Sequence, residues 1–272
     1  MGATAAEAIG ERGQTRSGLL TAAQALWGDG NVFPAEARLA AELAAVLKLK
    51  KDKDVAIFGS ALCGGARVLA DKLQTKISCY EWDPAMAQMA AGLNARSGAG
   101  FLLKTHQIAL ADGFPAGRQY DCVLVFLRLH QRPDRAKLIK QLAAALKPGG
   151  VLCTTNYVSG AEPLSQEARE KLFSDASPGP FMRLPDLHFQ LVSARLEVGM
   201  EFDVTQKYRE AIVGGFAAMK DVVLSIMRNQ ASAGEDLSRD VKLWAARHDE
   251  MKAGRLEVRC TLAMKREARA GL

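Results

Sequence analysis

The hydrophobic positions of this chain form short uninterrupted runs that alternate with amphipathic stretches between residues 34 and 155. An apolar run without polar alternation is typical of a strand covered on both faces, whereas apolar positions three or four residues apart are typical of a helix. These patterns predict strands at 55–58, 77–80, 101–110, 120–126 and 151–155. They predict helices at 16–27, 34–47, 66–73, 84–95 and 134–146.

The C-terminal part of the chain continues less regularly. Residues 159–185 are rich in proline and glycine and have no hydrophobic period, so we expect a loop there. Further helices are predicted at 187–196, 208–227 and 237–252, and further strands at 199–204 and 255–265. The order predicts the α/β class: a Rossmann-like, doubly wound, seven-stranded and mostly parallel sheet with a helical insertion before the last strand.

Two boundaries follow from the same patterns. Residues 1–15 have no apolar period, so we expect a disordered N-terminus followed by one domain over residues 16–272. Within that domain, the helical segment 208–254 is expected to form a lid over the C-terminal ends of the strands, where open α/β sheets bind ligands.

Residues 54–83 carry the main chemical signal of the sequence. The first predicted strand is followed by a turn containing Gly59, Gly64 and Gly65, then by a helix and a second strand that ends on Glu81. Such a turn lets the backbone approach a ligand, and an acidic residue at the next strand end binds a ribose diol. The pattern therefore predicts a nucleoside site, and its spacing suits either a dinucleotide or S-adenosylmethionine.

Composition and charge limit the cellular location and the partners that we expect for this chain. Of all residues, 49% are hydrophobic, but no stretch approaches the ~18 continuous apolar residues of a membrane span. We expect a cytoplasmic, reduced and metal-free protein, because the chain has no signal-peptide pattern and no cysteine pair with zinc spacing. Residues 252–272 hold six basic and two acidic residues, hence +4 of the net +6, which we interpret as a solvated tail. Contact of that tail with an acidic membrane surface or RNA stays open.

Five short segments carry a family resemblance. They are Val-Ala-Ile-Phe-Gly-Ser-Ala-Leu-Cys-Gly-Gly-Ala-Arg at 55–67, Cys-Tyr-Glu-Trp-Asp-Pro at 79–84, Tyr-Asp-Cys-Val at 120–123, Leu-His-Gln-Arg-Pro-Asp-Arg at 129–135 and Leu-Lys-Pro-Gly-Gly at 146–150. Together they resemble a class I S-adenosylmethionine-dependent methyltransferase over about residues 25–160. The entry at Trp27 and the helical insertion resemble small-molecule members, such as phosphoethanolamine-type and quinone-type methyltransferases.

This resemblance implies S-adenosylmethionine as the cofactor, a small-molecule substrate and no DNA partner. It implies His130, just after the fourth strand, as the general base, although a capping role fits the same position. Tyr157 and Tyr208 either line the acceptor pocket or belong to ordinary packing. The implied cofactor-binding residues are Gly59, Ser60, Ala61, Glu81, Trp82, Asp112 and Phe126.

Three residues depart from the family pattern and make its glycine-rich motif degenerate. The family usually has an acidic residue where this chain has Ile57, and glycines where it has Ala61 and Cys63. A left-handed backbone at Ala61 would add about 1–2 kcal/mol. All three changes together would cost about 3–4 kcal/mol, or two to three decades of cofactor affinity.

Two functions from different classes remain. The first is methyl transfer to a small molecule. The alternative is a catalytically weak or inactive methyltransferase-fold protein that acts as a binding partner. RNA methylation, which rests on the basic residues alone, is a weaker third hypothesis. The methyl acceptor and the oligomeric state, whether a homo-oligomer or a complex with another protein, stay open.

Overall fold

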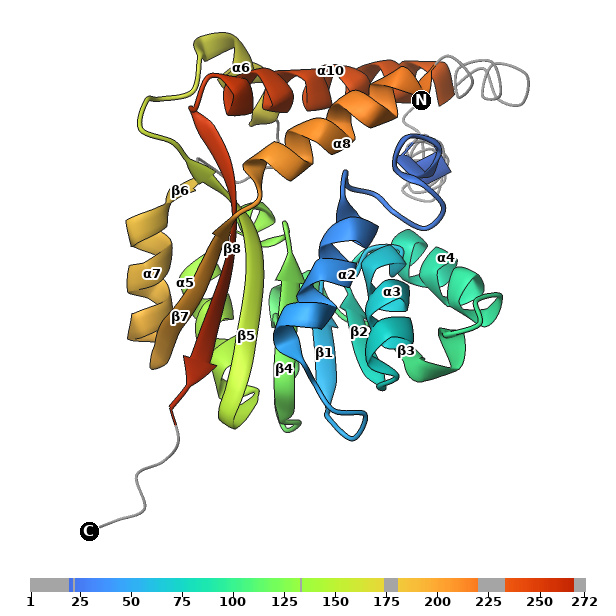
Figure 1. Ribbon diagram of the computed structural model, residues 1–272, viewed down its shortest axis with the longest axis vertical. Helices are drawn as coiled ribbons and strands as arrows, with labels where there is room; N and C mark the ends of the chain where they lie inside the picture. Colours follow the sequence, from blue (N-terminus) through green and yellow to red (C-terminus); the bar gives the residue numbers. More distant parts are fainter. Residues whose placement is uncertain (1–19, 22, 133, 174–180, 220–232, 267–272) are drawn as a thin grey trace, which may run out of the picture.

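The computed structural model describes residues 20–21, 23–132, 134–173, 181–219 and 233–266. A central sheet follows the order β3-β2-β1-β4-β5-β8-β7 (Figure 1). Its parallel strands are β1 (Val55–Phe58), β2 (Ile77–Glu81), β3 (Leu103–Gln107), β4 (Tyr120–Phe126) and β5 (Leu146–Ser159). The α/β doubly wound prediction is confirmed.

The last strand reverses direction. β8 (Leu256–Lys265) lies antiparallel between β5 and β7 (Leu196–Asp203), and the two-residue β6 (Met182–Arg183) adds to β5 beside it. Chain order reverses between β1 and β4, which makes their C-terminal ends the switch point where open α/β sheets bind ligands.

Helices cover both faces of the sheet. One face packs against α2 (Glu36–Leu47), α3 (Gly64–Leu73) and α4 (Pro84–Ala95), and the other against α5 (Arg135–Ala144) and α7 (Leu184–Ser193). All four residues of β1 are buried, as the uninterrupted apolar run requires. The two apolar layers that result hold the strand ends in fixed relative positions.

Three further helices lie together at the C-terminal ends of the parallel strands (Figure 1): α6 (Gln166–Leu172), α8 (Thr205–Ala217) and α10 (Ala233–Lys252). Residues 220–232, the end of the helix predicted at 208–227, lie outside the described residues, as does the N-terminus 1–15. We call α6, α8 and α10 the helical cover.

Several local predictions were wrong. Residues 159–185 are not simply a loop, because α6 and β6 form there. The Ser165 hydroxyl caps α6 by accepting from the Ala168 amide, and the Ser165 amide and hydroxyl donate to Glu250 of α10. A tertiary contact, invisible to local periodicity, thus stabilises this short helix.

Other boundaries shift by a few residues. The third strand covers only 103–107 of the predicted 101–110, and β5 already begins at Leu146, where a helix was expected to end. The helix predicted from Pro34 begins at Glu36, after Ala35 adopts a left-handed φ of 59°.

The basic C-terminal segment is also not a solvated tail. Arg255 pairs with Glu250, and Arg259 pairs with Glu257, both in or beside β8. Residues 256–265 of this segment instead form β8, which pairs with β5 and β7, an outcome that local composition does not reveal. Residues 267–272 lie outside the described part.

Candidate functional site

The turn after β1 has an unusual backbone. Gly59, Ala61 and Cys63 have φ angles of 70°, 49° and 61°. Glycine adopts such angles freely, whereas a residue with a Cβ pays about 1–2 kcal/mol. Ala61 and Cys63 are also buried, and Cys63 packs with Ile57 in the core below the turn. The two positions at which glycines were expected thus keep a glycine-type backbone while carrying side chains.

The amide groups of this turn point into the protein. Gly59 and Ser60 both donate to the carbonyl of Tyr80, at 2.7 and 3.1 Å. Ala61 donates to the Glu81 carboxylate at 2.6 Å. These donors are therefore engaged before any ligand arrives.

Glu81, the predicted ribose-binding residue, is completely buried at the end of β2. Its Oε1 accepts hydrogen bonds from the amides of Trp82 and Asp83, both at 2.9 Å. The same oxygen accepts from Arg128 Nη2 at 3.0 Å, and the other oxygen accepts from Ala61. Four donors from the protein thus already bond to the Glu81 carboxylate, which the sequence predicted to bind a ribose.

Arg128 is held on both sides. It pairs with Glu81 while its guanidinium carbon lies 4.2 Å from the ring centroid of Trp82. A Cβ on Gly59 would lie 2.7 Å from the Arg128 side chain and 2.9 Å from the Trp82 ring. Arg128 and Trp82 therefore fill the space against the glycine where a ligand would approach the backbone.

A second carboxylate occupies the start of α3. Glu36, on α2, accepts from the amides of Gly65 at 3.0 Å and Val32 at 3.2 Å. Burial raises the pKa of this side chain, although the two amides oppose that change. The positive end of the α3 dipole is thus already complemented from within. Nothing in the local sequence identified Glu36.

The remaining predicted cofactor residues are scattered. Phe126 is buried at the end of β4, and the buried Ser60 hydroxyl has no hydrogen-bond partner among the described residues. Asp112 is exposed on the short helix η2 (Leu110–Asp112). The structure brings Gly59, Ala61, Glu81 and Trp82 together, but no described contact joins Asp112 to them.

Beyond the end of β4, five side chains meet under the helical cover. We call them the Arg247 cluster: His130, Tyr157, Phe181, Trp244 and Arg247. The His130 ring lies 5.3 Å from Tyr157 and 5.8 Å from Phe181. His130 and Tyr157 were predicted from the sequence but Arg247 was not, because one arginine on a charged helix carries no distinguishing pattern.

His130 is only 8% exposed, and its Nδ1 has no hydrogen-bond partner among the described residues. Burial, followed by the positive charges of Arg247, Arg128 and Arg135, holds the pKa of His130 well below its usual range. The ring is therefore neutral near pH 7 and has a free ring nitrogen, but it is a weaker base than an ordinary histidine.

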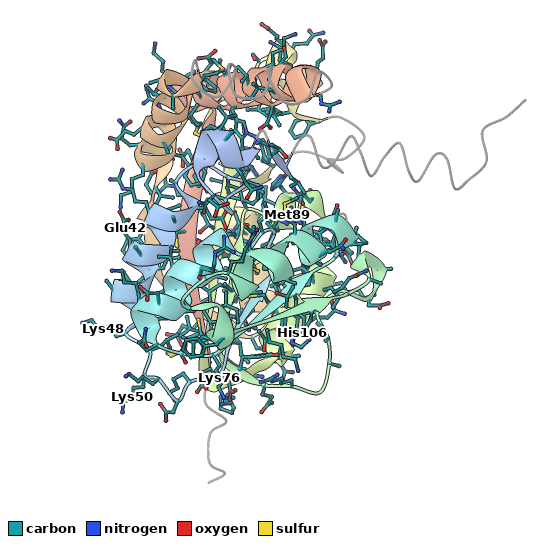
Figure 2. All side chains as sticks on the ribbon, turned by 90° about the vertical axis from the view of Figure 1, so that its right-hand side faces the viewer. Glu42, Lys48, Lys50, Lys76, Met89 and His106 are labelled. Carbon is teal, nitrogen blue, oxygen red and sulfur yellow. The ribbon has the colours of Figure 1, made fainter. Side chains whose placement is uncertain are left out.

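A separate cavity of about 410 Å³ lies between α2, the β7–β8 edge of the sheet and the start of α8. Glu42 lies on its rim on α2, and Figure 2 places Lys48, Lys50 and Lys76 toward the end of the molecule away from the helical cover. Neither the cavity nor these lysines adjoin the glycine-rich turn. The lining residues are Leu39, Glu42, Leu43, Val46, Thr155, Glu201, Phe202, Asp203, Val204, Lys207 and Cys260.

In the described part of the chain, no group of three or more histidine, cysteine or carboxylate side chains is placed to hold a metal ion. Among the same residues, no helix combines the length and the apolar character needed to cross a bilayer.

A family model described as a methyltransferase domain matches residues 58–154. No curated protein sequence matches the chain. Among solved structures, it is similar to Haemonchus contortus phosphoethanolamine N-methyltransferase 2 in complex with phosphomonomethylethanolamine and S-adenosylhomocysteine, with 15% identity, a TM-score of 0.81 and 92% of this chain covered. This chain spans only 58% of that protein's length.

Two other solved structures show how varied the chemistry on this fold is. The [4+2]-cyclase SpnF has 18% identity and a TM-score of 0.73, with 96% of each chain covered. Cyclopropane synthase MmaA2 from Mycobacterium tuberculosis has 13% identity and a TM-score of 0.72, with 85% of this chain and 83% of that one covered. At these identities the likenesses establish the fold and leave the reaction open.

Proposed function

Since this chain belongs to the class I S-adenosylmethionine-dependent methyltransferases by family and fold, we propose that it transfers a methyl group from S-adenosylmethionine to a small-molecule acceptor. The observation that carries the proposal is the placement of Glu81. Its carboxylate lies at the end of β2, next to the Gly59 turn and at the switch point of the sheet. A nucleoside diol bound to a carboxylate at that place is what this frame supports.

Glu81 and the Gly59 turn are the residue types that a nucleoside site needs, but in this structure other groups of the protein occupy them. Glu81 already accepts four hydrogen bonds, and Arg128 covers Gly59. A diol is also a donor of two hydrogen bonds, so it can replace donors of the same kind. We infer that the Arg128 guanidinium leaves Glu81 when the cofactor binds, and we call the Arg128–Glu81 ion pair the latch.

The other residues have defined roles in this proposal. Gly59, Ser60 and Ala61 form the floor of the nucleoside site, and Trp82 and Phe126 supply apolar walls. The cofactor supplies the activated methyl group, while the protein positions the acceptor and excludes water. His130 has a neutral ring that can take the acceptor's proton.

A second candidate function is that of a methyltransferase-fold binding protein, and the buried Arg128–Glu81 ion pair favours it. In a protein that no longer transfers methyl groups, the latch would be a permanent structural ion pair. The side chains at Ala61 and Cys63 would then be permanent filling of the turn. The [4+2]-cyclase SpnF has a similar fold, so the fold alone does not require methyl transfer.

Calorimetric titration separates the two candidates. The purified protein is titrated with S-adenosylmethionine and, separately, with S-adenosylhomocysteine, alongside the Arg128→Ala variant. Saturable one-to-one binding to the wild type supports the transferase. Absence of binding to both proteins rejects it and favours the methyltransferase-fold binding protein. Binding to Arg128→Ala alone would show that the frame persists but that the latch does not open by itself.

A further inference from the structure

Arg247, on α10, is a buried cation for which the described part of the chain supplies no ion-pair partner. The side chain is 9% exposed, and its guanidinium carbon lies 5.0 Å from the ring centroid of Tyr157 and 4.4 Å from that of Trp244. No carboxylate among the described residues forms an ion pair with it, in contrast to Arg128 and Arg255. Aromatic faces compensate only part of the cost of burying a charge.

The same cluster contains several other polar atoms without partners. Within the described residues, no hydrogen bond reaches Arg247 Nε, Trp244 Nε1, the Tyr157 hydroxyl or His130 Nδ1. Buried polar groups in folded proteins are normally paired with protein, water or ligand. So many in one place mark a site where something else supplies the partners.

The chemistry of these atoms specifies that partner. Arginine and the tryptophan ring nitrogen can only donate hydrogen bonds, and the tyrosine hydroxyl can also donate. A ligand that satisfies them must present acceptor oxygens, and one that also neutralises Arg247 must carry negative charge. The aromatic rings of Tyr157, Phe181 and Trp244 suit an apolar portion beside the anion.

We propose that the Arg247 cluster binds the methyl acceptor through an anionic group, a carboxylate or a phosphate, which pairs with Arg247 and accepts a hydrogen bond from Tyr157. That the anion is the methyl acceptor rests on the proposed function; the anion site itself does not. The acceptor thereby lies at the C-terminal ends of β4 and β5, next to His130.

Anion binding would also act on His130. Five groups surround this ring: Tyr157 and Phe181 in ring contact, and Arg247, Arg128 and Arg135 through their charges. After burial, the charge of Arg247 is the largest cause of the lowered pKa. An anion on Arg247 cancels part of that charge and makes His130 a stronger base once the acceptor is in place.

The test uses the full chain without S-adenosylmethionine, so that it is independent of methyl transfer. Three probes with similar rings are titrated calorimetrically: phenyl phosphate, phenylacetate and neutral benzyl alcohol. The variants are Arg247→Gln, which removes the charge, and Tyr157→Phe, which removes one donor. Arg96→Gln, at an exposed arginine after α4, is the matched control.

We expect at least one anion to bind tenfold or more tightly than benzyl alcohol, and the tighter anion identifies the acidic group. Arg247→Gln should weaken it at least tenfold and Tyr157→Phe severalfold, with Arg96→Gln unchanged. Arg247→Lys keeps the positive charge and is the second test in case Arg247→Gln does not fold. We expect it to retain part of the anion affinity. Equal binding of both anions to wild type and Arg247→Gln, or no anion binding to the wild type, overturns the proposal.

A second readout locates the bound anion. The His130 ring is titrated by NMR with and without saturating phenyl phosphate, or phenylacetate if that anion binds more tightly. A raised pKa places the anion at the cluster, and an unchanged pKa overturns that placement. Anion binding to a protein that does not bind S-adenosylmethionine would reject the proposed function and leave this site standing. Binding of S-adenosylmethionine without binding of either anion would reject the anion site and leave the proposed function standing.

Discussion

Removing Arg128 tests whether the latch competes with the cofactor. Arg128 is 4% exposed and Glu81 is fully buried, with 3.0 Å between Nη2 and Oε1. Deleting one partner of such a buried pair costs about 3–5 kcal/mol of unfolding free energy. Glu81 keeps three backbone donors in Arg128→Ala, so we expect a loss near the lower limit, about 3 kcal/mol.

The same change should strengthen cofactor binding. In the wild type, part of the binding free energy is consumed in moving the guanidinium away from Glu81 and from the Trp82 ring. If that displacement costs about 1.4–2.8 kcal/mol, Arg128→Ala binds S-adenosylhomocysteine about ten- to a hundredfold more tightly than the wild type. Urea unfolding measures the first effect and calorimetry the second.

Arg118→Ala is the control for this experiment. Arg118 also pairs with a carboxylate, Asp54, and also lies over an aromatic ring, Tyr120, but it is 54% exposed, and its partner precedes β1 at the opposite end of the sheet. We expect a stability change below about 1 kcal/mol and unchanged affinity. A wild-type protein that binds the cofactor more tightly than Arg128→Ala would refute the latch and make Arg128 a cofactor contact.

Three further outcomes follow from the structure. Glu81→Ala should weaken S-adenosylhomocysteine binding at least tenfold in calorimetry, and an unchanged dissociation constant would remove Glu81 from the nucleoside site. Ala61→Gly relieves about 1–2 kcal/mol of left-handed strain and loses about 0.8 kcal/mol of methyl burial. Its urea midpoint should therefore stay level or rise, whereas that of Ala70→Gly, inside α3, should fall by the equivalent of at least about 1 kcal/mol. A hydrogen bond from Arg255, above all, lowers the pKa of Glu250 to about 2. Because this folded-state pKa lies below the unfolded value, the stability it contributes is complete above about pH 5 and is lost as the pH falls toward 2. Over that pH range, the free energy of unfolding of the wild type should fall by up to about 3 kcal/mol more than that of Glu250→Gln. Urea unfolding at several pH values measures this difference.

Much of the fold could be predicted because local pattern and environment agree. The uninterrupted apolar run at 55–58 became a strand buried on both faces, and the runs at 77–80 and 120–126 became its two neighbours. The turn after β1 was also located correctly, because glycine spacing is a local property. Ala61 was noted as a departure, and the structure shows that its backbone keeps the left-handed angle that glycine would adopt.

The state of the candidate site could not be predicted, because it depends on partners far apart in the chain. Glu81 was placed at a strand end by its sequence, but Arg128, 47 residues later, decides whether its carboxylate is free. Glu36 reaches the start of α3 across 29 residues, and Arg247 reaches Tyr157 from the far end of the chain. Hydrophobic period and turn chemistry act between near neighbours, so the sequence alone determined the strands, the turn and the position of its acid. Which side chain meets that acid is decided by packing of the whole sheet and its helical cover, and only the tertiary structure shows the latch and the buried Arg247 near His130.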